Sequence, residues 1–253
     1  MNVLSLFSGI GGLDLAAEWA GMHTVAFVER DENCQKVLSK NWPGIKIHDD
    51  VCTLTARDVP ERIDIITGGY PCQPFSTVGK RQGADDERHL WPEYLRLIEE
   101  FEPYWVVGEN VAGHVTLGLD QVIDDLEYRG YATRAILIPA ASIGAQSIRE
   151  RVFILAYNAE KRRTKAGMVA ELQEEFRGKH RETSGLCDTK IPAKTYVPIR
   201  QRFWEIDDAE PCGGVHGLPS ELDKDRFGML GNTVIPQQAY PIFKSIMDIE
   251  SIA

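Results

Sequence analysis

The sequence predicts an α/β fold, in which helices cover both faces of a central β-sheet. Over the first 157 residues, short apolar runs alternate with amphipathic stretches, which is the pattern of βαβ units. A glycine-rich turn follows the first apolar run, where a strand would pass into a helix. With 43% hydrophobic and 26% charged residues, the chain also has the composition of a protein with a buried core.

The expected strands are short apolar runs with turn residues between them. They lie at Asn2–Leu6, Thr24–Glu29, Ile63–Thr67, Tyr104–Gly108, Ala132–Ile138 and Val152–Ala156, and a further strand is expected to end at Asp50-Val51. The expected helices lie between and after these strands. They span Leu13–Trp19, Glu32–Ser39, Pro92–Phe101, a segment that opens with Val122–Leu126, and roughly Gln237–Ile249.

Residues 158 to about 211 lose this alternation. They are rich in charge and poor in long apolar runs, so an inserted small domain or a long functional loop is expected there. The formal net charge of the chain is −10, yet residues 158–202 contain eleven Lys and Arg against six Asp and Glu. This basic segment on an acidic body would suit a polyanionic partner, although a solvated basic loop would have the same composition.

The ends and the cysteines of the chain limit its class. No stretch of 18 apolar residues occurs, so no membrane association is expected, and the first residues are interpreted as a core strand rather than a leader. The expected location is therefore the cytoplasm. Five cysteines, an odd number without a Cys-x-x-Cys pair, argue against a disulfide framework or a zinc site, and no metal is expected.

The glycine-rich turn and two acidic residues indicate a nucleotide-like ligand. Phe7-Ser8-Gly9-Ile10-Gly11-Gly12 lets the backbone turn tightly and approach a ligand at a helix N-terminus. Glu29, at the end of the second strand, could accept hydrogen bonds from ribose hydroxyls, and Asp50-Val51 could pair with an adenine amino group and pack its ring. Each acid alone could be a surface residue or a helix cap, but two acids at successive strand ends favour a site.

Cys72 is the candidate nucleophile. It lies in Gly68-Gly69-Tyr70-Pro71-Cys72-Gln73-Pro74, directly after an apolar run, so two prolines and a glycine turn would hold it on a stiff, accessible loop. Most cysteines are small buried residues, but a nucleophilic cysteine needs this kind of exposed setting.

A carboxyl group and two cations are expected beside Cys72. Glu109 ends the strand Tyr104–Gly108 and would project from the same edge of the sheet, unless its role is structural. Arg149 and Arg151 precede the last predicted strand of the sheet and could add positive charge to that cleft.

In this order, these motifs resemble the C5-type cytosine-specific DNA methyltransferases of bacteria and phages. The motifs are Phe7-x-Gly9-x-Gly11-Gly12, Glu29, Asp50-Val51, Pro71-Cys72-Gln73, Glu109-Asn110-Val111, Arg149-x-Arg151 and Gly231-Asn232-Thr233-Val234. The resemblance implies a Rossmann-like S-adenosylmethionine-dependent methyltransferase sheet formed by residues 1–157 and 228–253. Residues 158–227 would then be a small target-recognition region that binds DNA.

The resemblance also implies a mechanism. The thiolate of Cys72 would add to C6 of a flipped cytosine, while Glu109 binds N3 and the exocyclic amine. C5 would then attack the methyl group of S-adenosylmethionine, and proton loss with elimination of Cys72 would release 5-methylcytosine. Arg151 would contact O2 of the base, with Arg149 supporting it.

Further residue roles follow from the same resemblance. The implied cofactor-binding residues are Phe7, Gly9, Gly11, Gly12, Glu29, Asp50, Val51, Pro71, Asn232 and Thr233. The expected DNA contacts are Ser76, Lys80 and Arg81 in an active-site loop and Arg162, Arg163, Arg200 and Arg202 in the basic segment. Phe203 and Trp204 could be packing anchors for DNA binding or the small core of that segment. The expected enzyme is a monomer that acts on double-stranded DNA in a bacterial or phage-infected cell, with a cognate restriction endonuclease as a possible partner.

Three other functions fit parts of the sequence. A tRNA cytosine-5 methyltransferase shares the catalytic motifs, but the Cys-Phe-Thr tripeptide associated with it is absent. A non-catalytic DNA-binding relative would have no need of an intact Cys72, Glu109 and Arg151. A nicotinamide-dependent dehydrogenase would explain the glycine turn alone.

Overall fold

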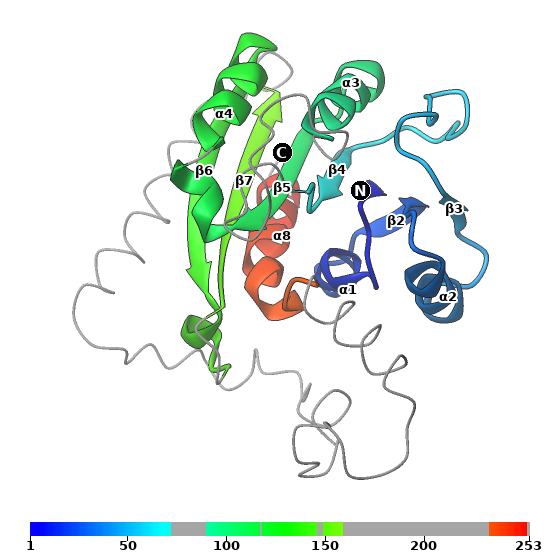
Figure 1. Cartoon of the computed structure of the whole chain (residues 1–253), viewed down its shortest axis with the longest axis horizontal. Helices are drawn as coiled ribbons and strands as arrows, with labels where there is room; N and C mark the ends of the chain where they lie inside the picture. The colour runs from blue at the N-terminus through cyan, green and yellow to red at the C-terminus, as the bar shows by residue number, and fades with distance from the viewer. Residues whose placement is uncertain (72–89, 117, 146–148, 159–232, 252–253) are drawn as a thin grey trace, which may run out of the picture. The chain divides into compact units, whose positions relative to one another are not determined.

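The computed structural model describes residues 1–71, 90–116, 118–145, 149–158 and 233–251 (Figure 1). These residues belong to one compact unit. Its strands are β1 (Asn2–Leu6), β2 (His23–Val28), β3 (Lys46–His48), β4 (Ile65–Gly68), β5 (Trp105–Val111), β6 (Tyr131–Pro139) and β7 (Glu150–Asn158). Its α-helices are α1 (Gly12–Trp19), α2 (Glu32–Asn41), α3 (Trp91–Phe101), α4 (Leu119–Tyr128) and α8 (Pro236–Ser251), and the 3₁₀ turns η2 (Ala112–Thr116) and η3 (Ala140–Ile143) follow β5 and β6.

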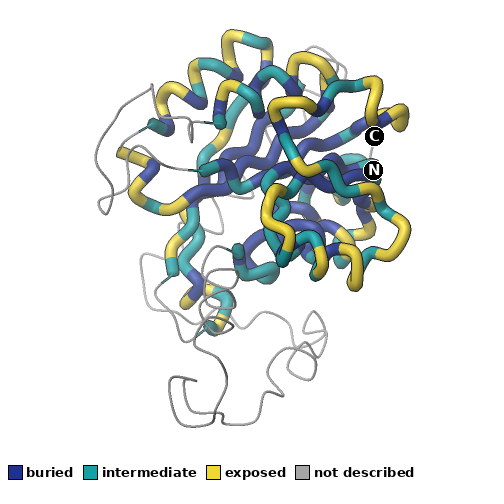
Figure 2. The backbone as a smooth tube through the Cα atoms, turned by 45° about the vertical axis from the view of Figure 1, so that its right-hand side comes forward, coloured by how far each residue is buried: buried dark blue, intermediate teal, exposed yellow. Residues whose placement is uncertain are grey.

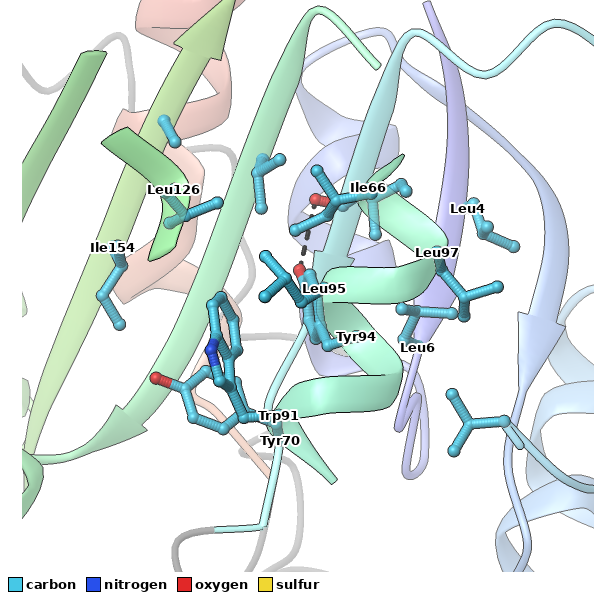
Figure 3. Close-up of a cluster of buried hydrophobic side chains, with 14 of the residues drawn as sticks. Leu4, Leu6, Ile66, Tyr70, Trp91, Tyr94, Leu95, Leu97, Leu126 and Ile154 are labelled. Carbon is cyan, nitrogen blue, oxygen red and sulfur yellow. Dashed lines mark hydrogen bonds between the residues drawn. The ribbon is translucent and has the colours of Figure 1, made fainter. Parts of the chain in front are cut away.

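The strands form one sheet in the order β3-β2-β1-β4-β5-β7-β6. Strands β1 to β5 pair in parallel, whereas β7 runs antiparallel to both β5 and β6. In Figure 3, α3 lies in front of the strands and α1 and α8 lie behind them. The predicted α/β fold with helices on both faces is therefore confirmed. The strand order reverses between β1 and β4, and open α/β sheets bind their ligands at the carboxyl ends of strands beside such a reversal.

Every strand and helix predicted from the apolar runs is present, with shifts at the ends. One shift of three residues is in β5, which continues to Val111 instead of ending at Gly108. The reason is tertiary, because antiparallel β7 pairs with β5 as far as Val111↔Arg151 and extends the ladder. The strand expected to end at Asp50-Val51 ends at His48.

The core lies between the sheet and the helices, and the buried residues follow the strands (Figure 2). Val3, Leu4 and Leu6 of β1 are fully buried, as expected for a strand covered on both faces. On one face an aromatic group joins this core, in which Tyr94 of α3 stacks against Trp91 and also contacts the ring of Tyr70 (Figure 3). The core thus reaches the carboxyl ends of the strands, where the candidate site lies.

Helix α8 attaches the C-terminal segment to the sheet. The buried side chain of Gln238 donates from Nε2 to the carbonyl oxygen of Ile138 at 2.7 Å and to that of Arg149 at 3.2 Å. At the other end of α8, Glu250 accepts a hydrogen bond from Nε1 of Trp105 at 2.6 Å. These bonds and the packing of α8 against α1 bring the segment before α8 to the first turn of the chain.

Asp14 in the first turn of α1 is a buried carboxyl group. Its two oxygens accept hydrogen bonds from the hydroxyls of Ser5 at 2.8 Å and Thr24 at 3.0 Å, so it ties α1 to β1 and β2. Burial raises the pKa of Asp14 to about 6, although the two hydrogen bonds oppose that rise. No helix in the described part of the chain is long and apolar enough to cross a membrane.

We predict that Asp14 makes the stability of the fold pH-dependent. Because its pKa is higher in the folded than in the unfolded state, the folded state binds more protons and the free energy of unfolding falls as the pH rises from about 4 to about 6. A rise of about two units corresponds to about 3 kcal/mol at most. Asp14→Asn removes this titration. The free energy of unfolding of the variant, relative to that of the wild type, should therefore increase as the pH rises from about 4 to about 6. Urea unfolding at several pH values measures this difference, with exposed Asp120→Asn as the control. A difference that stays constant with pH would contradict the assignment.

Candidate active site

The glycine turn after β1 is closed by Glu29. The turn has positive φ angles at Phe7 (51°), Gly9 (56°) and Gly11 (86°). Oε2 of Glu29 accepts a hydrogen bond from the backbone nitrogen of Gly9 at 2.7 Å, and Oε1 accepts one from that of Asp31 at 2.8 Å. The carboxylate therefore lies against the turn, one residue beyond β2, as the sequence predicts.

The last segment of the chain packs on the same turn. A Cβ atom added to Gly12 would lie 2.7 Å from both Cγ2 of Thr233 and the carbonyl oxygen of Val234, so this position has no space for a side chain. The carbonyl oxygen of Thr233 accepts a hydrogen bond from Nη2 of Arg149 at 2.5 Å. Thus Gly12, Thr233 and Arg149, which are far apart in the sequence, form one cluster.

Arg96 holds the loop of Asp50 and Val51, and the sequence did not single it out. Its guanidinium donates to the carbonyl oxygens of Val51 at 2.9 Å and Leu54 at 3.0 Å, and Glu93 and Glu100 flank it on α3. Before the fold is known, Arg96 is one of several charged residues on the polar face of an amphipathic helix. Only the packing of α3 shows that it supports the loop that carries Asp50 and Val51.

Glu109 is buried beside a cation. Only 7% of the residue is exposed, and its Oε1 lies 2.8 Å from Nε of Arg151 on the adjacent strand β7. Burial raises the pKa of Glu109 to about 7, whereas the charges of Arg151 and Arg149 lower it. A carboxyl group with such a pKa can either donate or accept a proton near neutral pH.

The turn that leads to Cys72 contacts Glu109 and Asn110. A Cβ atom on Gly69 would lie 2.7 Å from Oε2 of Glu109, so a side chain at this position would have to displace the carboxyl group. The side-chain amide of Asn110 donates to the carbonyl oxygen of Tyr70 at 3.1 Å. The strand end Glu109-Asn110 therefore fixes the backbone just before Pro71.

The structure places all of the predicted site residues that it describes at or near one edge of the sheet. Phe7, Gly9, Gly11, Gly12, Glu29, Asp50, Val51, Pro71, Glu109, Arg149, Arg151 and Thr233 all lie on the turns at this edge of the sheet, on the strand β5 that reaches it or on the segments that pack there. Cys72, Ser76, Lys80, Arg81, Arg162, Arg163, Arg200, Arg202 and Asn232 lie outside the described residues, and their roles stay predictions. The same holds for the proposed boundaries of the region 158–227.

The site combines two chemical environments. Glu29 and Asp50 follow β2 and β3 and offer carboxylate oxygens next to a glycine turn, which suits the hydroxyl and amino groups of a nucleoside. Glu109, Arg149 and Arg151 offer a protonatable carboxyl group and two cations, which suits a polar heterocycle. The fold is that of a Rossmann-like α/β enzyme, with its candidate site at the carboxyl ends of the parallel strands.

Comparison with known proteins identifies the family. Residues 1–209 match the family described as C-5 cytosine-specific DNA methylase. The chain belongs to this family, and its class of enzyme is DNA (cytosine-5-)-methyltransferase. This confirms the resemblance found in the motifs.

Individual relatives agree with the family. The chain is 29% identical to the Type II methyltransferase M.AquIA of Picosynechococcus over 246 residues, which cover 89% of this chain and 96% of that protein. It is 36% identical to the Type II methyltransferase M.HgiBI of Herpetosiphon aurantiacus over 60% of this chain and 36% of the relative. A crystal structure described as a DNA modification methyltransferase encoded within an E. coli prophage matches with a TM-score of 0.55 and 31% identity, over 64% of this chain and 48% of that one. The chain thus spans nearly all of M.AquIA but less than half of the other two.

We predict that Gly69→Ala reduces methyl transfer far more than stability. The added methyl group would displace the carboxyl end of Glu109, and misplacing a reacting group by about 1 Å can lower the rate about 100-fold. Gly113→Ala is the matched control, because a Cβ atom there has nothing within 4 Å. Thermal unfolding and methyl transfer to DNA should be measured on both variants. Equal activity in the two variants would contradict the role of this close approach.

Proposed function

We propose that the protein transfers a methyl group from S-adenosylmethionine to C5 of a flipped cytosine in double-stranded DNA, through a covalent bond between Cys72 and C6. The observation that carries this proposal is the buried Glu109–Arg151 pair, which lies against the turn that leads directly into Pro71-Cys72. Membership of the cytosine-5 methylase family supports the same reaction.

Glu109 would supply the proton for ring activation. Burial raises the pKa of this carboxyl group to about 7, so its acid form is accessible near neutral pH and can donate to N3 of cytosine. Its other oxygen would accept a hydrogen bond from the exocyclic amine. Protonation at N3 makes C6 electrophilic, so the thiolate of Cys72 adds there and electron density moves to C5.

The two arginines would keep the base and the carboxyl group in place. Arg151 is in contact with Glu109 and is the candidate donor to O2 of the base. Arg149 binds the backbone of Thr233 and would support Arg151 and the cofactor segment together. Addition of the Cys72 thiolate to the base would therefore depend on two cations that the fold holds at this edge of the sheet.

The residues around the glycine turn fit S-adenosylmethionine. Glu29 would accept hydrogen bonds from the ribose hydroxyls in place of the backbone nitrogen of Gly9, and Asp50 would bind the adenine amino group, with Val51 packing on its ring. Phe7, Gly9, Gly11, Gly12, Pro71, Asn232 and Thr233 would complete this site. S-adenosylmethionine held by these residues would supply an electrophilic methyl group, with S-adenosylhomocysteine as the product. We propose no metal in this reaction.

DNA binding would extend beyond the described residues. Ser76, Lys80 and Arg81 and the basic residues Arg162, Arg163, Arg200 and Arg202 are the proposed contacts to the duplex. Because C5 and C6 are stacked within the duplex, the target base has to be flipped out before Cys72 can reach it. We further propose that the enzyme acts as a monomer and protects DNA from a cognate restriction endonuclease.

We predict that Cys72→Ala abolishes methylation without loss of cofactor binding. Plasmid DNA from cells without cytosine methylation of their own should carry 5-methylcytosine at a recurring sequence when the wild-type chain is expressed, and none with Cys72→Ala. Base-resolution mapping measures this, and calorimetry with S-adenosylhomocysteine should give equal affinities for both proteins, within about twofold. Soluble wild-type protein that leaves DNA unmethylated would contradict the proposal, and methylated tRNA from the same cells would favour the RNA alternative.

We predict that the titration of Glu109 makes the pH profile of kcat/KM fall at alkaline pH. The acid form of Glu109 is lost as the pH rises through about 7, so kcat/KM for DNA should decline above that pH. In Glu109→Gln the activity should drop about 10²–10⁴-fold, and the residual rate should lack this decline because an amide does not titrate. Profiles measured between about pH 5.5 and 9 test this. A variant that keeps the wild-type decline would show that another group is responsible.

A further inference from the structure

Tyr70 is held more firmly than a connecting residue requires. It follows β4 and immediately precedes Pro71-Cys72, yet only 4% of it is exposed. Its phenolic oxygen lies 2.7 Å from Nε2 of His114, which is also buried. Its carbonyl oxygen accepts the hydrogen bond from Asn110. Backbone and side chain of the same residue are therefore bound to one segment, residues 110–114.

Aromatic rings surround this hydrogen bond. The ring centroid of Tyr70 lies 5.1 Å from that of Trp91, 5.9 Å from that of Tyr94 and 5.4 Å from that of His114 (Figure 3 shows Tyr70, Trp91 and Tyr94). Packing alone would hold a ring in such a place but would tolerate rotation and sliding. A hydrogen bond in apolar surroundings is directional and costly to leave unmade, so it fixes the orientation.

The position of this pair in the chain links two reacting groups. His114 follows Glu109 by five residues through Val111 and the turn η2, and Tyr70 precedes Cys72 by two residues. Pro71 between them has a restricted φ angle, so the orientation of Tyr70 constrains the backbone at Pro71, the last described residue before Cys72. The hydrogen bond thus connects the segment that carries the carboxyl group with the segment that carries the thiol.

We propose that His114 and Tyr70 form a positioning pair, which sets the approach of the Pro71-Cys72 backbone to Glu109 for attack on the base. This inference rests on the proposed function, because it assigns the pair a role in the addition of Cys72 to cytosine. Burial lowers the pKa of His114 to about 4, so the imidazole stays neutral and the pair is the same throughout the pH range of an assay. Neither residue is assigned a contact with the base or the cofactor.

The test measures the addition step itself. DNA in which 5-fluorocytosine replaces cytosine traps the covalent adduct, because the fluorine cannot leave as a proton does, and the rate of adduct formation with S-adenosylmethionine can be followed on denaturing gels. The variants are Tyr70→Phe, His114→Leu, His114→Gln and the double variant Tyr70→Phe/His114→Leu. Tyr131→Phe is the matched control, since it also removes a buried tyrosine hydroxyl, which donates to the carbonyl oxygen of Pro103 at 2.9 Å before the start of β5.

The proposal predicts a defined pattern. Tyr70→Phe and His114→Leu should each slow adduct formation on the order of tenfold, the factor expected when a buried hydrogen bond that holds a reacting group is lost. The double variant should be no slower than the slower single variant, because both changes remove the same bond. His114→Gln can still hydrogen-bond to the phenol and should recover part of the rate. Affinity for S-adenosylhomocysteine should stay within about twofold, and Tyr131→Phe should react like the wild type.

Each contrary result has a separate meaning. If the wild type forms no adduct, the proposed function fails and this inference fails with it. If the wild type reacts and Tyr70→Phe reacts equally fast, only the positioning pair is overturned. Multiplying effects in the double variant, or a parallel loss of cofactor affinity, would show general loosening of the fold instead and would also overturn it. Should His114→Leu not fold, Tyr70→Phe compared with Tyr131→Phe decides the question, because each loses a single oxygen atom.

Discussion

The burial of one carboxyl group beside two arginines is the constraint on which the site depends. Glu109 lies in strand β5 and is buried. Burial raises the pKa of its carboxyl group, and the charges of Arg151 and Arg149 limit that rise. A buried carboxylate without a cation would be costly, and a carboxylate with strong pairing would never be protonated at neutral pH. The balance between the two keeps Glu109 able to give and take a proton.

This balance follows from the direction of one strand. Because β7 runs antiparallel to β5, its first residues lie next to the last residues of β5, and Val111 pairs with Arg151. A parallel neighbour would have placed its own carboxyl end there instead. The register of this pair therefore brings the Arg-x-Arg motif to the Glu-Asn-Val motif, although about 40 residues separate them in the sequence.

Two glycines of the site allow neighbouring segments to lie close to the backbone, in addition to the flexibility that glycine gives the chain. Gly12 makes room for Thr233 and Val234, and Gly69 makes room for the carboxyl group of Glu109. At both positions the backbone of a glycine lies closer to a neighbouring segment than a side chain would allow. Arg96, Asn110 and Gln238 complete this arrangement, since each holds a backbone carbonyl group of another segment.

The sequence by itself determined the class of fold, the positions of nearly all strands and helices, and the family of the chain. Apolar periodicity indicates strands and helices through local burial, and motifs such as Pro71-Cys72-Gln73 and Glu109-Asn110-Val111 occur in the order typical of the family. The tertiary structure alone decided that β5 extends through Glu109, that Arg149 binds Thr233, and that Tyr70 and His114 meet. These features depend on strand order, register and packing between distant segments, and a local sequence pattern carries no information about which distant side chain will be its neighbour.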